Sequence, residues 1–430
     1  MDLLTRRPRG TNDVLPGESP RWLHIEDRIR DVCGRFGFSE IRTPIFEHAD
    51  LYTRTSGETS DILEKETYTF QDRGRRMLTL RPEGTPGVAR AFLENGLGSG
   101  PMPAKYYYLG PMFRYDRPQA GRYRQHTQFG VEIIGAPGPE ADFEVIMIAV
   151  TFLRDLGLGS LAVHLNSIGC PACRPTYREA LVSHYRAAQE ELCEDCRRRL
   201  ERNPLRLLDC KNPRCQPLKD AAPRSVNYLC PECQSHFRAL EGLLDRFGIE
   251  HHIDLTLVRG LDYYTRTVFE LIYHGLGAQG AVCGGGRYDG LIEAIGGPPT
   301  PGVGYGMGLE RVLLTLEREG MHPPSTRGTD IAVLSAAGEE HPELRLQTLD
   351  LVYAMRWAGL AAETDYAGRG LRQQMRWADR IGARLVTVVG SEEIASGQVK
   401  VKDMAGGTET QVPLAELVAR VSEMVRGPRT

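Results

Sequence analysis

The sequence lacks any apolar run long enough to cross a membrane. Its longest strongly apolar stretch, residues 145–153, is far shorter than the roughly 20 residues that a membrane-spanning helix needs. Residues 1–10 also lack the apolar core of a secretory signal. These absences argue against a membrane protein and against export, so we expect a cytoplasmic protein with no membrane partner.

An excess of positive charge is absent as well. The chain carries 53 Lys and Arg against 56 Asp and Glu, which gives a formal net charge of −3. A nucleic acid would therefore have to bind at local clusters of cations. Arginine clusters of this kind occur at two places: Arg117, Arg122 and Arg124, and then Arg369, Arg372, Arg376 and Arg380.

Internal repeats and low-complexity tracts are also missing. With 41% apolar and 25% charged residues, the composition is that of a soluble globular protein and not of a disordered one. At 430 residues the chain exceeds one ordinary domain, so we expect two or three hydrophobic cores.

The first part of the chain predicts an antiparallel sheet packed with helices. Three segments read as strands separated by turns and not by helices, which is typical of antiparallel pairing: 75–85, 105–114 and 129–135. Residues 20–36 and 139–156 carry helical patterns. The segment 38–46 alternates like a strand, and its Pro44 suits a sheet edge or an interface.

Residues from about 170 to 248 differ in character, because they are rich in cysteine and charge and have helical stretches. We read them as an insert between two halves of one catalytic domain, which spans residues 1–325. Prolines and small residues over 320–328 predict a linker. Beyond it, strand-like and helix-like segments alternate, which predicts a small α/β domain over residues 329–430.

The segment 257–270 is the most informative part of the chain. It places a cation, two phenols and a carboxylate in a stretch that otherwise reads as a strand: Leu257-Val-Arg-Gly-Leu-Asp-Tyr-Tyr-Thr-Arg-Thr-Val-Phe-Glu270. Burying such groups costs free energy unless each one has a partner, and a polar ligand is a natural partner. The alternative is a strand edge with solvated charges.

Four further segments occur with it in one order along the chain: Arg81-Pro-Glu-Gly-Thr85, Phe113-Arg-Tyr-Asp-Arg-Pro-Gln119, Gly284-Gly-Gly-Arg-Tyr-Asp-Gly-Leu291 and Gly302-Val-Gly-Tyr-Gly-Met-Gly-Leu-Glu-Arg311. Together the five segments resemble the histidyl-tRNA synthetases, a family of class II aminoacyl-tRNA synthetases. The likeness spans nearly the whole chain, and the run 257–264 is specific to this family rather than to the class.

The resemblance implies an α+β protein: a class II catalytic core with an antiparallel sheet, a helical cysteine-rich insert, and a C-terminal α/β anticodon-binding domain. It implies a histidine–tRNA ligase, which activates L-histidine with ATP and Mg²⁺ to histidyl-adenylate. Histidine is then transferred to the 3′ end of tRNA(His), with release of AMP and pyrophosphate. The helix and strand over residues 20–46 look like motif 1, which builds a homodimer interface in this family, although an ordinary packed helix and edge strand would give the same pattern.

Three arginines of these segments carry over to ATP. The attack of a carboxylate on the α-phosphate needs positioning and charge neutralisation more than a protein nucleophile. The resemblance gives Arg114 the α-phosphate and the substrate carboxylate, and Arg259 the catalytic stabilisation of charge on the α-phosphate. It gives Arg311 the γ-phosphate, for which a salt bridge with Glu310 or another neighbour is the alternative.

Seven residues carry over to a histidine site: Glu83, Gly84, Thr85, Gln128, Glu132, Tyr263 and Tyr264. Selectivity for an imidazole needs groups that recognise both ring nitrogens. Glu132 can accept a hydrogen bond from one ring N–H, and Tyr264 can serve the other nitrogen. Glu83 and Gln128 carry over to the α-ammonium group, and the others line the site. In isolation Glu132 would read as a strand carboxylate that faces solvent.

The segment 116–124 is the class II motif 2 loop by the same resemblance. Its polar residues suit contact with the acceptor end of a tRNA, because phosphates and unstacked terminal bases attract Arg and Gln. These residues are Arg117, Gln119, Arg122 and Arg124. A mobile loop with solvated charges is the alternative.

Eight of the ten cysteines form four close pairs: Cys170 and Cys173, Cys193 and Cys196, Cys210 and Cys215, and Cys230 and Cys233. In a reducing cytoplasm such pairs are typical of thiolate zinc sites and not of disulfides. Eight ligands would make two four-cysteine sites, or one site with spare thiols, and any zinc would be structural. Free thiols with chance spacing are the alternative. Redox-active pairs are disfavoured, because no βαβ frame surrounds them.

Two other functions compete with the ligase. A non-catalytic paralogue of the synthetase that senses histidine for regulation usually loses the phosphate-binding arginines and the C-terminal domain, and both are present here. A zinc-ribbon module for nucleic acid on an idle scaffold is disfavoured by the intact run 257–264. Histidine-dependent pyrophosphate exchange separates the three functions.

Overall fold

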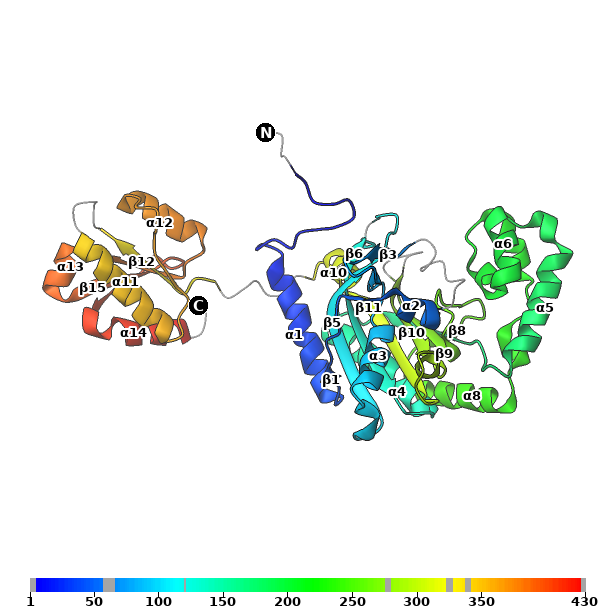
Figure 1. Ribbon diagram of the computed structural model, residues 1–430. Helices are drawn as coiled ribbons and strands as arrows, with labels where there is room; N and C mark the ends of the chain where they lie inside the picture. Colours follow the sequence, from blue (N-terminus) through cyan, green and yellow to red (C-terminus); the bar gives the residue numbers. More distant parts are fainter. Residues whose placement is uncertain are drawn as a thin grey trace. The chain divides into compact units, whose positions relative to one another are not determined.

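The computed structural model describes residues 5–56, 66–119, 121–274, 280–321, 328–336 and 342–426. The chain divides into two compact units, Met1–Pro323 and Pro324–Thr430 (Figure 1). Most of the linker expected over residues 320–328 lies outside the described residues. No helix among the residues described is long and apolar enough to cross a membrane.

The first unit is built on an eight-stranded sheet. Its order is β1 (Ser39–Glu40), β5 (Ala104–Phe113), β6 (Gln125–Ile134), β11 (Gly302–Gly308), β10 (Ala281–Arg287), β9 (Thr265–Tyr273), β7 (Leu161–Ser167) and β8 (His251–Ile253). The six inner strands all pair antiparallel, as the turn-separated segments predict. Only the two edge strands, β1 and β8, pair parallel with their neighbours.

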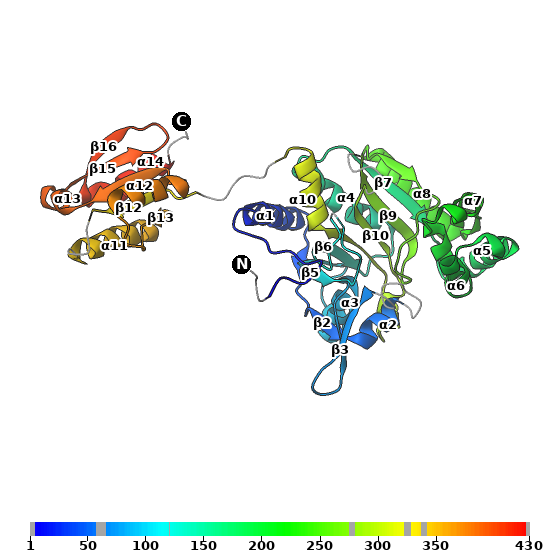
Figure 2. The same cartoon turned by 90° about the horizontal axis from the view of Figure 1, so that it is seen from above.

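Helices cover both faces of this sheet (Figure 2). One face packs against α1 (Ser19–Arg35), α4 (Pro139–Asp155), α8 (Pro231–Arg246) and α10 (Leu309–Arg318). The other face packs against α3 (Thr85–Glu94) and the short α9 (Leu291–Ala294). Tyr107 belongs to the first core and Tyr108 to the second, because successive side chains of a strand point to opposite faces.

A three-stranded antiparallel sheet lies beside α2 (Ala49–Ser56). Its order is β2 (Phe46–His48), β4 (Met77–Leu80) and β3 (Tyr68–Gln71). The strand expected over 75–85 is therefore only β4, and Thr85 already begins α3.

The strand expected over 38–46 is wrong in its middle, since only β1 and the start of β2 are strands. Pro44 has no amide hydrogen for a sheet ladder. The carbonyl of the preceding Thr43 accepts a hydrogen bond of 3.0 Å from the buried Arg81 side chain and not from a strand.

The segment 257–270 is also only partly a strand. β9 begins at Thr265, and residues 257–264 form a loop with turns. The alternating pattern predicted a strand, but the polar groups of this stretch find their partners on other elements and not on a neighbouring strand. We call residues 257–264 the specificity loop.

The cysteine-rich insert follows β7 and ends in α8. Its lobe contains α5 (Arg174–Ala187), α6 (Glu194–Arg202) and α7 (Gln216–Asp220), together with four short 3-10 helices: Gln189–Glu191, Pro204–Asp209, Pro213–Cys215 and Ser225–Tyr228. An apolar cluster of its own holds this lobe together, with Tyr177, Leu181, Leu200 and Leu207 buried in it.

The second unit is an α/β domain, as the alternating segments predict. Its five-stranded sheet has the order β13 (Ala362–Glu363), β12 (Ile331–Ser335), β14 (Leu385–Val389), β15 (Gln398–Asp403) and β16 (Glu409–Pro413). The first three strands are parallel and the last two are antiparallel. The helices are α11 (Pro342–Trp357), α12 (Leu371–Arg380), α13 (Ser391–Ser396) and α14 (Leu417–Arg426), which the 3-10 turn Leu414–Glu416 precedes.

Candidate functional site

A buried carboxylate lies at the centre of the face covered by α3. Glu132, on β6, is 0% exposed, and it accepts hydrogen bonds from Thr85 Oγ1 at 2.6 Å and from the Tyr288 hydroxyl at 2.5 Å. Burial raises the pKa of Glu132 to about 8, although the hydrogen bonds from these hydroxyls act in the opposite direction. This carboxyl group is therefore held in one orientation before any ligand binds.

The tyrosines of the specificity loop meet the residues before α3. Tyr263 donates a hydrogen bond of 2.8 Å to Glu83, and the rings of Tyr263 and Tyr264 are 4.7 Å apart between centroids. Burial raises the pKa of Tyr264 to about 12, so its hydroxyl keeps its proton at neutral pH. The Tyr108 hydroxyl lies 3.4 Å from the side-chain oxygen of Gln128.

Glycines of the sheet and of the α3 terminus make room for these side chains. A Cβ at Gly84 would lie 2.2 Å from the Tyr108 ring, and a Cβ at Gly306 would lie 2.3 Å from the Gln128 amide nitrogen. Likewise, a Cβ at Gly284 would lie 2.5 Å from a guanidinium nitrogen of Arg259. These side chains therefore lie directly over glycine backbone.

Beside this cluster lies a cavity of about 270 Å³, called the cationic cavity because arginines outnumber acids in its lining. Its wall contains four arginines, Arg114, Arg122, Arg259 and Arg311, and three acids, Asp116, Glu270 and Glu310. Burial and the nearby Arg114 and Arg122 lower the pKa of His126, also in the wall, to about 3. Burial raises the pKa of Glu310 to about 7. The arginines of the wall, and not these shifts, favour an anionic ligand in the cavity.

Arg259 is held in this cavity by an ion pair with Glu270 on β9. Burial alone would lower the pKa of Arg259, but the Glu270 carboxylate, together with Tyr264, Cys283 and Tyr263, outweighs it, and the pKa lies above its ordinary value. Its Nε atom is buried and makes no hydrogen bond within the described part of the chain. A buried cationic donor without a partner points to a ligand that would supply one.

The other two predicted arginines are oriented by backbone carbonyl groups. Arg114, directly after β5, donates from Nε to the carbonyl of Pro82 at 2.8 Å. Arg311, in the first turn of α10, donates to the carbonyl of Ala281 at 2.6 Å. The alternative of a salt bridge between Arg311 and Glu310 is not what the geometry shows, because Glu310 accepts from the backbone amide of Thr127 at 2.7 Å.

The loop between β5 and β6 closes one side of the cavity. Arg122 forms an ion pair with Asp116, and both line the cavity. The guanidinium of Arg124 stacks 3.8 Å from the centre of the Tyr115 ring. Arg117 and Gln119 are exposed, so the two of them are open to a partner outside the protein.

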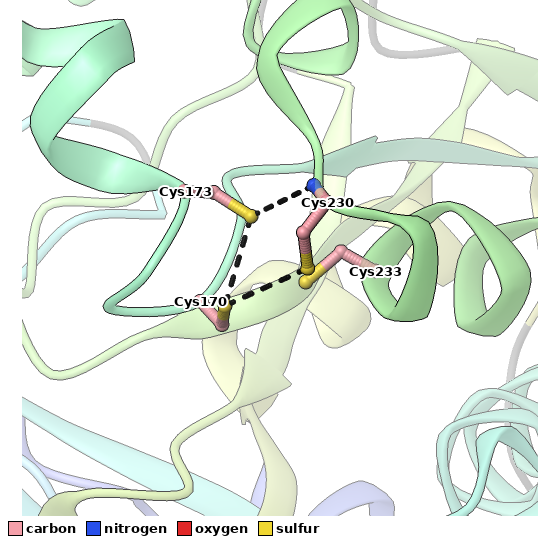
Figure 3. Close-up of side chains that lie close together, drawn as sticks. All are labelled: Cys170, Cys173, Cys230 and Cys233. Atoms are coloured by element: carbon pink, nitrogen blue, oxygen red, sulfur yellow. Dashed lines mark hydrogen bonds between the residues drawn. The ribbon is translucent and has the colours of Figure 1, made fainter.

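The eight paired cysteines form two separate groups, and all eight are free thiols. Within each group the four sulfur atoms lie within 4.8 Å of one another. The basal cluster joins Cys170 and Cys173, after β7, to Cys230 and Cys233, at the start of α8 (Figure 3). The distal cluster joins Cys193, Cys196, Cys210 and Cys215 inside the insert lobe.

The sulfur geometry of both clusters fits a tetrahedral metal. Cys170 Sγ lies 3.6 Å from Cys173 Sγ and 4.0 Å from Cys230 Sγ. A Zn–S distance of roughly 2.3 Å in a tetrahedron requires sulfur atoms about 3.8 Å apart. Backbone amides also donate to sulfur, from Cys230 to Cys173 at 3.1 Å and from Cys193 to Cys215 at 3.3 Å.

Comparison with known proteins shows the family to which the chain belongs. Residues 10–312 match the family model for histidyl-tRNA synthetase, and residues 331–424 match the anticodon binding domain. The chain belongs to the histidyl-tRNA synthetase family. It is 51% identical to the histidine–tRNA ligase of Desulforamulus reducens over 97% of this chain and 98% of that protein. It is also 51% identical to the histidine–tRNA ligase of Desulforudis audaxviator, over 99% of this chain and 100% of that protein.

A solved structure supports the same membership. The apo histidyl-tRNA synthetase of S. aureus is 38% identical, with a TM-score of 0.82, and the match covers 97% of this chain and 100% of that one. The class II fold with a C-terminal anticodon-binding domain is thus confirmed for this member of the family.

Most of the residues that the family motifs suggested either contact Glu132 or Tyr263 or line the cationic cavity. The sequence reasoning missed Tyr288, Tyr108 and Glu270. Tyr288 stands in the motif Gly284-Gly-Gly-Arg-Tyr-Asp-Gly-Leu291. The signal that could have identified Tyr288 was its phenol, close after three consecutive glycines in this motif. Glu270 ends the informative segment 257–270, so it was visible as a carboxylate without an assigned partner.

Three of the four clustered C-terminal arginines of this family member lie on one helix. Arg372, Arg376 and Arg380 of α12 are exposed, whereas Arg369 pairs with Asp365 at 2.7 Å. Three of the four clustered cations are thus accessible on the anticodon-binding domain.

Proposed function

We propose that the chain is a histidine–tRNA ligase. It joins L-histidine and ATP into histidyl-adenylate with release of pyrophosphate, and it then transfers histidine to the 3′ end of tRNA(His) with release of AMP. The observation that carries the proposal is the buried carboxyl group of Glu132, oriented by Thr85 and Tyr288, next to a cavity with four arginines. The full-length relatives named histidine–tRNA ligase support it.

In this proposal the ring of histidine binds between Glu132 and Tyr264. Glu132 accepts from one ring N–H, and the Tyr264 hydroxyl serves the other nitrogen. A buried acceptor that loses its partner costs free energy, so an amino acid without the imidazole N–H is rejected. Glu83 and Gln128 bind the α-ammonium group, while Gly84, Thr85 and Tyr263 shape the site around them.

The arginines act on ATP, which enters with Mg²⁺. The carboxylate of histidine attacks the α-phosphate, and pyrophosphate leaves. Arg114 contacts the α-phosphate and the attacking carboxylate, Arg259 stabilises the charge that develops on the α-phosphate, and Arg311 binds the γ-phosphate. The unpartnered Nε of Arg259 supports its role, because a phosphate oxygen would satisfy it.

The tRNA meets the protein at two places. Arg117, Gln119, Arg122 and Arg124 of the motif 2 loop contact the acceptor end, and the C-terminal domain reads the anticodon. The exposure of Arg117 and Gln119 supports the first contact, and the exposed arginines of α12 support the second.

The protein acts as a cytoplasmic homodimer in this proposal. Large apolar side chains of the motif 1 region remain exposed, with Leu23 at 53%, Ile45 at 44% and Phe46 at 49%. Exposed large apolar side chains in this region support a protein interface. Sedimentation equilibrium tests the dimer, and a monomer at micromolar concentration would contradict it.

The cysteine clusters bind structural Zn²⁺ in this proposal. Eight thiols arranged as two sets of four support zinc, since four thiolates are the usual ligands of structural sites. The clusters lie outside the cationic cavity, so the metal takes no part in the chemistry.

Histidine-dependent exchange of pyrophosphate into ATP tests the ligase. We expect exchange with histidine and none above background with glutamine or phenylalanine, which lack the imidazole. Charging of tRNA(His) transcripts should follow. A protein that binds histidine but shows neither reaction would be the regulatory paralogue instead.

A further inference from the structure

The specificity loop makes contacts with the insert as well as with the catalytic sheet. Arg174 of α5 donates a hydrogen bond to the backbone carbonyl of Tyr264. Asn203, which follows α6, donates to the carboxylate of Asp262 at 2.6 Å. Val258 packs against the apolar cluster of the insert lobe. The loop that carries Arg259, Tyr263 and Tyr264 is thus held from outside at three points.

The root of the insert, which comprises the end of β7 with residues 168–173 and the segment 225–233, contacts the two ends of the specificity loop as well. Asn166 of β7 donates to the carbonyl of Leu257 at 2.9 Å, and Ser225 of the insert lies 3.3 Å from the Asn166 side-chain oxygen. At the other end, Arg266 exchanges backbone hydrogen bonds with Ile168 and Gly169, directly before Cys170. The loop is therefore anchored to the same short stretch of chain that begins the basal cluster.

The basal cluster lies next to these contacts. Cys173 directly precedes Arg174, and Glu232, between Cys230 and Cys233, lies 3.6 Å from Arg266. Around this cluster the apolar packing is small: its buried members are Cys173, Leu229 and Cys233. Besides the four sulfur atoms, two hydrogen bonds join the ends of the insert here: from Ser225 to the carbonyl of Ser167 at 2.7 Å and from Tyr177 to the carbonyl of Pro223 at 3.1 Å.

The distal cluster has a different environment. Cys196, Cys210 and Cys215 belong to the larger apolar cluster of the lobe, with several leucines and two tyrosines. Apolar packing there would keep part of the lobe folded without metal. The two clusters should therefore differ in what their loss does to the specificity loop.

We propose that each cluster binds one Zn²⁺ ion and that the basal ion positions the specificity loop for histidine. This inference rests on the proposed function. With the basal ion bound, the ends of the insert are joined, and Arg174 holds the Tyr264 carbonyl in place. Without it, the four thiols, whose sulfur atoms lie within 4.8 Å of one another, bind no common ion, and the root of the insert opens. Because Arg174 follows Cys173 directly, the Tyr264 contact moves with it.

Coupling of this kind should affect the binding of histidine more than the binding of ATP. Tyr263 and Tyr264 belong to the proposed histidine site, and Arg259 of the same loop is proposed to act in the chemical step and not in ATP binding. The proposed ATP-binding residues Arg114 and Arg311 lie elsewhere, directly after β5 and on α10. A misplacement of about 1 Å in a binding group can cost on the order of 10²-fold in rate. Loss of the basal ion should thus raise the KM for histidine and leave the KM for ATP nearly unchanged.

The metal content of the full chain tests the sites. We expect two zinc ions per chain in the wild type, measured by elemental analysis after expression with ample zinc. Cys230→Ser/Cys233→Ser and Cys210→Ser/Cys215→Ser should each retain one. Cys33→Ala removes a buried thiol outside both clusters and should retain two. A metal-free wild type with eight titratable thiols would overturn the sites, and iron in place of zinc would overturn the choice of metal.

Exchange kinetics test the coupling. We expect the basal double variant to raise the histidine KM by about tenfold or more, with the ATP KM changed by less than about twofold. The distal variant should have a smaller effect. An unchanged histidine KM in the metal-depleted basal variant would overturn the coupling.

A variant that keeps the metal covers the case in which the cysteine variants fail to fold. Arg174→Ala removes the contact with Tyr264 and should retain two zinc ions with a raised histidine KM. Arg186→Ala, on the same helix but exposed, is its matched control and should behave like the wild type. If Arg174→Ala also leaves the histidine KM unchanged, the coupling is wrong. A wild type with two zinc ions but no exchange would instead contradict the proposed ligase.

Discussion

Tyr288 and Thr85 hold the two oxygens of one carboxyl group. Tyr288 donates to Glu132 Oε2 at 2.5 Å, and Thr85 donates to Oε1 at 2.6 Å. Tyr288 follows β10, and Thr85 begins α3, so two distant parts of the chain fix the orientation of Glu132. A group that is oriented before the ligand arrives loses less freedom on binding.

Tyr288→Phe is expected to weaken histidine binding. The change removes one hydrogen bond to a buried carboxyl group, which is worth about 1.5 kcal/mol or more, or roughly tenfold. The histidine KM in pyrophosphate exchange should rise accordingly, while the ATP KM stays close to that of the wild type. Tyr305→Phe is a matched control, because the buried Tyr305 hydroxyl makes no hydrogen bond to the described residues. Equal effects of the two variants would contradict the role of Tyr288.

Glu132→Gln is expected to change how stability depends on pH. The folded pKa is about 8, against roughly 4.3 in an unfolded chain. Between these values the folded protein holds a proton that the unfolded chain has lost. The contribution of Glu132 to stability is thus present in full below about pH 4, and it is lost as the pH rises to 8.

Melting temperatures without ligand check this sign. The difference between Glu132→Gln and the wild type should widen in favour of the variant by about 2 °C or more from pH 5 to pH 8. Glu310, whose pKa is raised to about 7, is present in both proteins and cancels in the comparison. Parallel curves for the two proteins would show that Glu132 is ionised throughout.

Arg259→Ala is expected to cut adenylate formation by on the order of 10²-fold or more, because the charge partner of the transition state is lost. Histidine binding should remain measurable by calorimetry. Arg154→Ala, at an exposed position near the end of α4, is the control and should retain its exchange rate. A near-wild-type rate for Arg259→Ala would exclude the proposed role.

Removal of residues 329–430 is expected to separate the two half-reactions. The cationic cavity and Glu132 lie in the unit Met1–Pro323, so histidine activation should survive in part. Aminoacylation should be lost, because the anticodon end of the tRNA has no binding site. Undiminished charging of tRNA(His) by the shortened chain would mean that the second unit does not read the anticodon.

Local patterns predicted the inner strands β5 and β6, the helices α1 and α4 and the α/β alternation of the second unit, because these depend on spacing within one segment. The loop 257–264 was misread, since its alternation reflects partners on other elements, such as Glu83 for Tyr263. Tyr288 was missed for a similar reason: its partner Glu132 is 156 residues away. The grouping of the cysteines also needed the fold, because the basal cluster joins pairs 60 residues apart.

The bare backbone under the functional side chains makes single methyl groups selective probes. A methyl at residue 306 would meet the amide of Gln128, and a methyl at residue 284 would meet the guanidinium of Arg259, with no main-chain atom among the nearest contacts of either. Gly306→Ala should therefore disturb the ammonium end of histidine, and Gly284→Ala the phosphate. Each substitution would thus displace one side chain of the proposed site sterically, while every charged and polar group of the site remains present.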